Sequence, residues 1–124
     1  MRSILLLNAK RGCGKTTMAT NIAAYYAMKG KNVVLADFDP QGSSMDWLDA
    51  RPADRPPIRG LAAWQNAVRV PKNTEYLIMD SPAAVSGRPL ANLVQRADSI
   101  LIPILPSPID IRAAEHFIGQ LNAQ

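Results

Sequence analysis

The fold is decided by the stretch Asn8-Ala9-Lys10-Arg11-Gly12-Cys13-Gly14-Lys15-Thr16-Thr17, which lies between an apolar run and a helical pattern. The run before it, Ile4-Leu5-Leu6-Leu7, is typical of a strand that is buried on both faces of a parallel sheet. After it, small and apolar residues recur with helical spacing as far as Lys29-Gly30, where a basic residue and a glycine predict the helix end. The sequence therefore predicts a glycine-rich loop that joins a buried strand to a helix.

This loop has the composition of a phosphate-binding site. A helix N-terminus presents unpaired N–H groups and partial positive charge, which favour a polyphosphate. Gly12 and Gly14 allow the backbone to curl around phosphates, Lys15 supplies a positive charge, and the Thr16 hydroxyl suits Mg²⁺. The spacing G-x-x-x-x-G-K-[ST] is met except at its first position, which is Ala9, so the loop is a deviant form.

Lys10 brings a second lysine into the loop, and residues 10–17 resemble the deviant Walker A motif (K-G-G-x-G-K-T-T) of the ParA/MinD family of ATPases. Three later segments agree with it in the same order along the chain. Asp37-Phe38-Asp39-Pro40-Gln41-Gly42-Ser43 resembles the D-x-D-P-Q-G-[SN] signature of the ParA branch, and residues 76–82 resemble the Walker B strand. Residues 102–110 are similar to the strand and loop that follow in small ParA proteins.

The alternation of strand and helix patterns predicts an α/β fold with a mainly parallel sheet in three layers, with helices on both faces. The resemblance implies the same architecture, that of the P-loop NTPases. It implies a single domain over residues 1–124, without the C-terminal portion that family members usually carry. Further helices are expected around residues 43–48, 61–68, 89–97 and 111–121, the first capped by Ser43 and Ser44.

The resemblance also implies a set of site residues for ATP and Mg²⁺. Nucleotide contacts are expected from Lys10, Arg11, Gly12, Cys13, Gly14, Lys15, Thr16 and Thr17. The Mg²⁺ ligand shell is expected to involve Thr16, Asp37 and Asp80, and the catalytic residues are expected to be Lys10, Lys15 and Asp39. In the family, the residue matching Lys10 reaches the phosphates of a second subunit, and the one matching Asp39 orients the attacking water. From the residues alone, Asp37 and Asp39 could instead cap the turn at Pro40, and Asp80 could cap a turn or helix.

Arg11 departs from the family motif, which has glycine at this position. A long guanidinium here would clash with an approaching second subunit or pair with phosphate as an added cation. The hypothesis is that Arg11 leaves nucleotide binding intact and impairs dimerisation or hydrolysis.

Composition narrows the function classes. The 124 residues are 48% hydrophobic with a net charge of +4, and the seven arginines from Arg51 to Arg112 are dispersed, which favours a solvated surface. No apolar stretch is long enough to span a membrane, and we expect no signal peptide, because Met1-Arg2-Ser3 runs directly into the first strand. The single cysteine and single histidine, Cys13 and His116, argue against iron–sulfur carriage and the usual zinc sites.

The leading interpretation is a ParA-like ATPase with weak, partner-stimulated activity that positions a plasmid, chromosome or protein cargo such as a carboxysome. The resemblance implies an ATP-dependent homodimer, non-specific DNA and an ATPase-stimulating adaptor protein as partners, no membrane, and a bacterial cytoplasmic, nucleoid-associated location. The alternatives are a MinD-like membrane-cycling regulator, a metabolic ATP-dependent enzyme of the same superfold, or a nucleotide-binding fragment without turnover.

Overall fold

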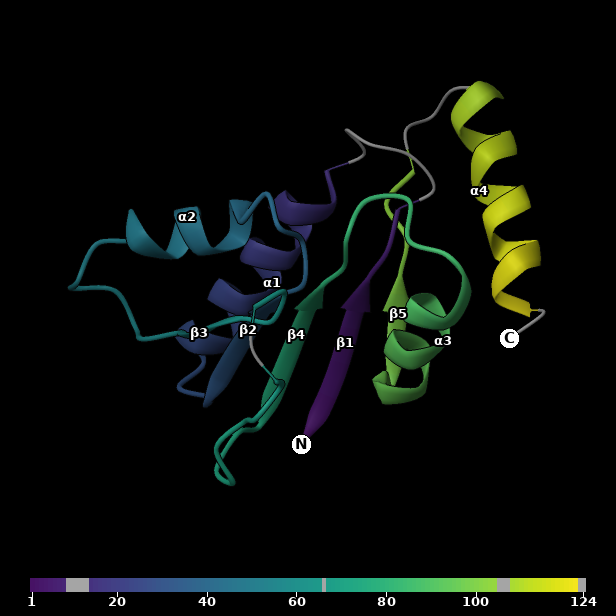
Figure 1. Ribbon diagram of the computed structural model, residues 1–124. Coiled ribbons are helices and arrows are strands. Elements are labelled where there is room, and N and C mark those ends of the chain that lie inside the picture. The colour runs from purple at the N-terminus through teal and green to yellow at the C-terminus, as the bar shows by residue number, and fades with distance from the viewer. Residues whose placement is uncertain (9–13, 66, 105–107, 123–124) are drawn as a thin grey trace.

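The structure is a computed structural model that describes residues 1–8, 14–65, 67–104 and 108–122. Its centre is a sheet of five parallel strands in the order β3-β2-β4-β1-β5 (Figure 1). The strands are β1 (Arg2–Leu6), β2 (Val33–Asp37), β3 (Arg59–Ala62), β4 (Tyr76–Asp80) and β5 (Ser99–Leu101). All pairings are parallel, so the carboxyl ends of the strands lie at one edge of the sheet.

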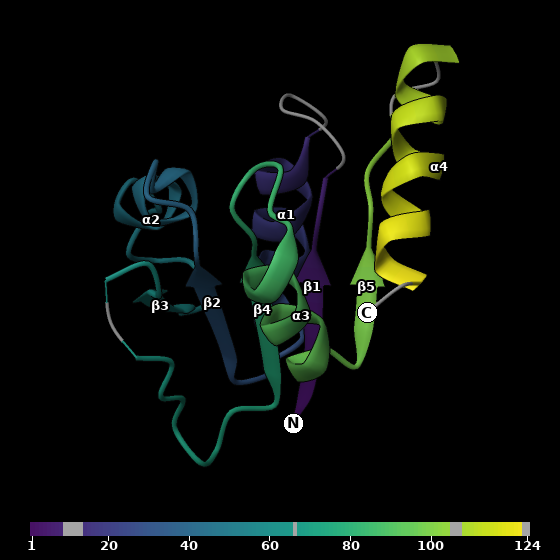
Figure 2. The ribbon, with the colours of Figure 1, turned by 45° about the vertical axis from the view of Figure 1, so that its right-hand side comes forward.

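Helices cover both faces of the sheet, which confirms the three-layer prediction (Figure 2). On one face, α1 (Lys15–Met28) and α2 (Ser43–Asp49) pack on the side chains of Ile4, Leu6, Leu35 and Ile78. On the other face, Leu90 and Leu93 of α3 (Gly87–Arg96) and Phe117 of α4 (Pro108–Asn122) belong to one buried cluster with the strand residues Leu5, Leu7, Val34, Ala36, Leu77 and Met79. Successive side chains of a strand point to opposite faces, and here both faces are buried, which explains the continuous apolar runs.

The prediction of a helix over residues 61–68 is wrong, because the chain there forms the end of β3 followed by a turn. Pairing with β2, in which Leu35 lies opposite Gly60, overrides the helical spacing of the apolar residues. Gly60 also allows β3 to pass closely beneath α2, since a Cβ atom there would lie 2.8 Å from Leu48 Cδ1. Leu61 instead packs against the core on the α3 side of the sheet.

Two further expectations need smaller corrections. The last strand ends at Leu101, before the expected segment from residue 102, and Pro103 cannot donate to a sheet ladder. The helix at 111–121 is present as α4, but its buried apolar residue is Phe117, while Ile111 and Ile118 are 46% and 42% exposed. Leu121, which belongs to the expected pattern, also packs against the core, so the helix is confirmed and its apolar face is only partly as expected.

The short helix expected at 43–48 is present as α2, but the two serines do not cap it. Gly42 is the N-cap residue, in the left-handed conformation with φ of 69°, and both serines lie within the first turn. The first-turn N–H groups of Ser44 and Met45 are instead bound by a carboxylate that comes from β2, that of Asp37. This places the start of α2 directly beside the carboxyl ends of β2 and β4.

Candidate functional site

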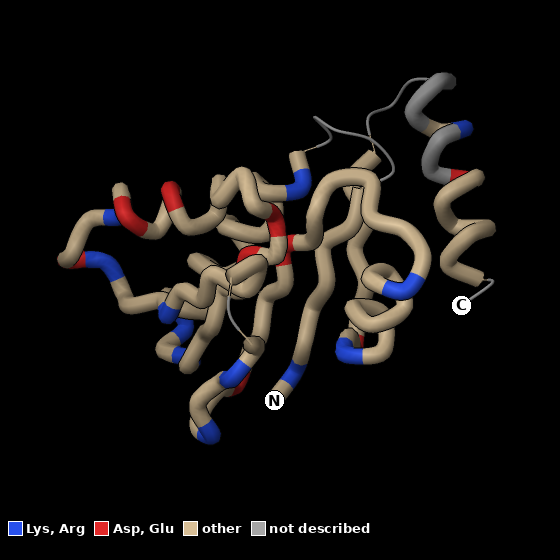
Figure 3. The backbone as a smooth tube through the Cα atoms, viewed as in Figure 1, with Lys and Arg blue, Asp and Glu red and all other residues tan. Residues whose placement is uncertain are grey.

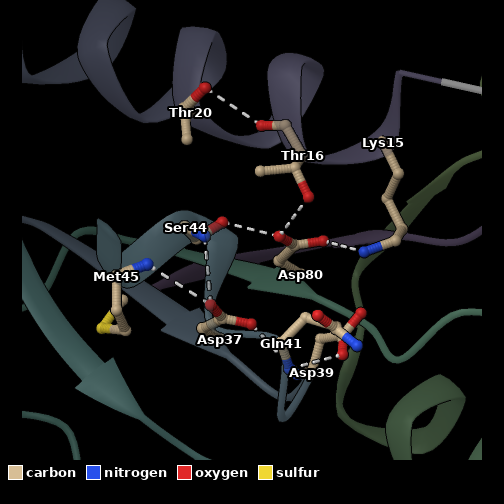
Figure 4. A network of polar contacts seen from close by, with 9 residues as sticks. All are labelled: Lys15, Thr16, Thr20, Asp37, Asp39, Gln41, Ser44, Met45 and Asp80. Atoms are coloured by element: carbon tan, nitrogen blue, oxygen red, sulfur yellow. Dashed lines mark hydrogen bonds and ion pairs between the residues drawn. The ribbon is translucent and has the colours of Figure 1, made fainter. Parts of the chain in front are cut away.

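Asp80, the last residue of β4, is the centre of a buried polar network (Figure 4). Its carboxylate accepts hydrogen bonds on both oxygens, and its side chain is 1% exposed. Oδ1 is paired with the ammonium group of Lys15, while Oδ2 accepts from Thr16 Oγ1 at 3.0 Å and from Ser44 Oγ at 2.6 Å. The starts of two helices, α1 and α2, therefore converge on one carboxylate.

Lys15 and Thr16 reach Asp80 because they form the first turn of α1, directly above the ends of β1 and β4. Gly14 starts the helix with φ of 80°, a conformation that glycine adopts without the strain other residues meet. Among the described residues, no side chain caps this helix start. The first N–H groups of α1 therefore remain available to an anion.

Asp37 lies next to Asp80 across the sheet, since the two residues are opposite each other in the β2–β4 pairing. Its carboxylate is fully buried and is held by backbone groups: Oδ1 accepts from Asp39 N at 3.0 Å, and Oδ2 from Ser44 N at 3.1 Å and Met45 N at 3.3 Å. Burial raises the pKa of Asp37; the N–H donors oppose this rise, and the neighbouring charge of Asp80 adds to it. Asp37 thus fixes both the turn after β2 and the start of α2.

Asp39 lies in that turn, where its Oδ1 accepts a hydrogen bond from Gln41 N at 3.0 Å. Both residues line a pocket of about 330 Å³ together with Gly14, Lys15 and Thr16. Asn8 lines the same pocket, and its buried Oδ1 has no hydrogen-bond partner among the described residues. The pocket thus combines an uncapped helix start, a lysine and an unsatisfied polar atom.

The structure brings together Lys15, Thr16 and Asp80 from the predicted site and places Asp37 behind them. Gly14 and Thr17 line the pocket, whereas Lys10, Arg11, Gly12 and Cys13 lie outside the described residues. Ser44 was missed, because sequence reasoning assigned it to a helix cap. The contact of its hydroxyl with Asp80 depends on how α2 packs beside the end of β4, and no pattern in the sequence reports that packing.

Within the described part of the chain, Asp, Glu, His and Cys side chains do not gather into a group of three or more that could hold a metal ion. Thr16 and Asp80 together offer a hydroxyl and a carboxylate oxygen. This small donor set is the kind that Mg²⁺ uses when phosphates and water complete its octahedron. The site fits a metal that is held jointly with a nucleotide better than a metal caged by protein.

The parallel sheet and the lysine and threonine at the start of α1, facing a strand-end aspartate, define a nucleotide-binding domain of the P-loop type. Comparison with known proteins agrees with this class. The model of the CobQ/CobB/MinD/ParA nucleotide binding domain matches residues 4–123, and the chain belongs to this family.

Two curated relatives and one solved structure are informative. The chain is 34% identical to maintenance of carboxysome distribution protein A of Halothiobacillus neapolitanus, over 98% of this chain and 58% of that protein. It is 53% identical to the chromosome-partitioning ATPase Soj of Thermus thermophilus over 51 residues, which are 41% of this chain and 20% of Soj. A plasmid partition protein from Borrelia burgdorferi, solved with AMPPNP bound, shares the fold with a TM-score of 0.77 at 14% identity, covering 98% of this chain and 70% of that one.

The chain thus spans somewhat more than half the length of the carboxysome distribution protein that it matches. Across the described residues, none of the helices has the length and apolar character needed to cross a bilayer.

Proposed function

We propose that this chain is the phosphate-binding part of a ParA-like ATPase that positions a cargo, such as a plasmid, a chromosome or a carboxysome. The observation that carries the proposal is the convergence of Lys15 and Thr16 on Asp80 at the start of a helix that no described side chain caps. The similarity to a carboxysome distribution protein and to Soj supports the cellular role.

ATP with Mg²⁺ is the proposed ligand. The phosphates would lie over the start of α1, where Lys15 and the first N–H groups of the helix would bind them. Thr16 and Asp80 would hold Mg²⁺, with Asp37 supporting the metal shell from behind, and the bound metal would offset the charge of the phosphates. Asp39 at the pocket wall would orient the attacking water.

Lys15 has to leave Asp80 to reach a phosphate. The ion pair is buried, with 5% and 1% of the two side chains exposed, so neither charge is stable alone. A nucleotide phosphate would replace Asp80 as the partner of Lys15, and a divalent cation would replace Lys15 as the partner of Asp80. Nucleotide and Mg²⁺ should therefore bind cooperatively.

The proposal extends to the residues outside the described ranges. Lys10 would reach the phosphates of a second subunit, and Arg11 would impair that dimer or hydrolysis. Light scattering after gel filtration, with ADP and then with a slowly hydrolysed ATP analogue, tests both ideas on the chain and on Arg11→Gly. A dimer that forms with the analogue and strengthens in Arg11→Gly is expected. A monomer in both proteins would contradict the dimer proposal.

Non-specific DNA is the proposed partner surface of the ATP-bound form, and the distribution of charge supports it. Basic residues that are far apart in the sequence gather at the amino ends of the strands, opposite the carboxylates of the site (Figure 3). They outnumber the acidic Glu75 and Asp98 at this end: Arg2, Lys29, Lys31, Arg59, Lys72 and Arg96. Arg59 and Arg96, two of the arginines dispersed in the sequence, thus lie at the same edge as Arg2 and three lysines, because parallel strands all begin at one edge.

Fluorescence anisotropy with a labelled DNA duplex tests this surface. The double variant Arg59→Glu/Lys72→Glu is expected to weaken binding at least several-fold and to flatten its salt dependence. Arg88→Glu/Arg112→Glu is the matched control, because it changes the net charge equally and both arginines are exposed but lie in α3 and α4. Equal losses in the two variants would contradict the assignment of DNA to this edge.

The adaptor protein and the cytoplasmic, nucleoid-associated location are proposed on the same family grounds. The corresponding test is whether a protein captured by the ATP-bound chain stimulates its ATP hydrolysis.

A further inference from the structure

Of the described donors to the Asp80 carboxylate, Ser44 is the one that the proposed nucleotide chemistry does not use. The other two donors, Lys15 and Thr16, belong to the phosphate-binding loop and the start of α1. Under the proposed function, which this inference rests on, both turn towards phosphate and metal when ATP binds. Ser44 comes from α2, and the proposed function gives its hydroxyl no contact with phosphate or metal.

The geometry of the Ser44 contact is that of a strong hydrogen bond. Ser44 is fully buried, and its Oγ lies 2.6 Å from Asp80 Oδ2. A carboxylate oxygen accepts, so the serine hydroxyl donates, and a bond from a hydroxyl to a charged acceptor is about twice as strong as a neutral one. This bond fixes the direction of the oxygen that also faces Thr16.

Ser44 is itself held by the Asp37 carboxylate, which also binds the turn that carries Asp39. The Asp37 carboxylate binds the N–H groups of Ser44 and Met45 with one oxygen and that of Asp39 with the other. A displacement of Asp39 therefore acts on Asp37, then on the first turn of α2, and then on Asp80. Figure 4 shows these residues as one continuous chain of contacts.

We propose that Ser44 is a positioning residue, which orients Asp80 for the metal and links the metal side of the site to the turn that holds Asp39. Without its hydroxyl, Asp80 would lose its fixed orientation once Lys15 and Thr16 move to the ligand. The consequence is a weaker response of nucleotide binding to Mg²⁺, with little change in the affinity for metal-free nucleotide. Removal of a partner that orients a metal ligand typically costs about 10- to 100-fold in metal affinity or activity.

The test compares Ser44→Ala with Thr20→Val in a titration of a fluorescent ATP analogue, first in EDTA and then at increasing Mg²⁺. Thr20 is the matched control because it is also a buried hydroxyl, but it donates to the Thr16 carbonyl within α1 and does not contact Asp80. Ser44→Ala should raise the Mg²⁺ concentration at half-maximal effect about 10-fold and change the affinity in EDTA less than twofold. Thr20→Val should match the wild type in both.

Ser44→Thr keeps the hydroxyl and is expected to restore the wild-type Mg²⁺ response. If Ser44→Ala does not fold, Ser44→Cys replaces it, because a thiol has similar size and is a weak donor. An unchanged Mg²⁺ response in a folded Ala or Cys variant would overturn the role of Ser44 while leaving the proposed function intact. A wild-type chain that binds no nucleotide would refute the proposed function, and the role of Ser44 with it.

Discussion

Breaking the buried ion pair between Lys15 and Asp80 should strongly destabilise the nucleotide-free protein. Asp80→Asn removes the charge that balances a lysine with 5% of its side chain exposed. Breaking a buried pair by removing one partner costs about 3–5 kcal/mol, because the remaining charge is left in a poorly solvated site. For a chain of 124 residues this corresponds to a fall in Tm of more than about 10 °C.

The exposed pair between Lys31 and Glu75 provides an internal control. Its charged atoms are 3.8 Å apart and its side chains are 45% and 44% exposed, so Glu75→Gln should cost less than about 1 kcal/mol. Free energies of unfolding come from urea denaturation in EDTA without nucleotide. In the double variant Lys15→Met/Asp80→Asn, the cost should be smaller than the sum of the two single costs. The reasoning is refuted if Asp80→Asn and Glu75→Gln destabilise the protein equally.

Three other outcomes follow from the structure. Hydrogen bonds from the backbone N–H and hydroxyl of Ser3 hold the pKa of Asp98 below its usual range. The stability that results is present at neutral pH and is lost as the pH falls through the lowered pKa. The Tm of Asp98→Asn should therefore lie below that of the wild type at pH 7 and approach it below about pH 4. Calorimetry should show that Gly42→Ala lowers the free energy of unfolding by about 2 kcal/mol or more, and Gly87→Ala by about 1 kcal/mol. Both glycines have positive φ, but only at Gly42 would the new Cβ meet another side chain, at 3.3 Å from an indole carbon of Trp64. Phe117→Ala should cost about 3 kcal/mol and Ile118→Ala less than about 0.5 kcal/mol in chemical denaturation; the reverse order would contradict the orientation of α4.

The central strands were predictable because strands buried on both faces appear in the sequence as continuous apolar runs. Residues 4–7, 33–36 and 76–79 form short continuous apolar runs, and their length together with the adjacent turn residues favours strands that are buried on both faces. β3 was not predictable, because its four residues are stabilised by pairing with β2 and by the close approach that Gly60 allows. That contact is between segments far apart in the chain, and local periodicity does not report it.

The same distinction applies to the site. Lys15, Thr16 and Asp80 were expected together because each lies where a strand ends or the following helix begins, and those points share one edge of a parallel sheet. The use of the Asp37 carboxylate to hold the start of α2, and of Ser44 to hold Asp80, depends on the angle at which α2 meets the sheet. Two adjacent serines at a helix start look like a cap, and only the structure shows otherwise.

The measurement that tests the central claim most directly is calorimetric titration of the chain with ATP and Mg²⁺. The account predicts one nucleotide bound per chain, binding that weakens strongly in Lys15→Met, and binding that is unchanged in Lys31→Met, which removes an exposed lysine far from the pocket. No saturable binding by the wild type, or equal binding by the two variants, would contradict the assignment of the phosphate site to the start of α1.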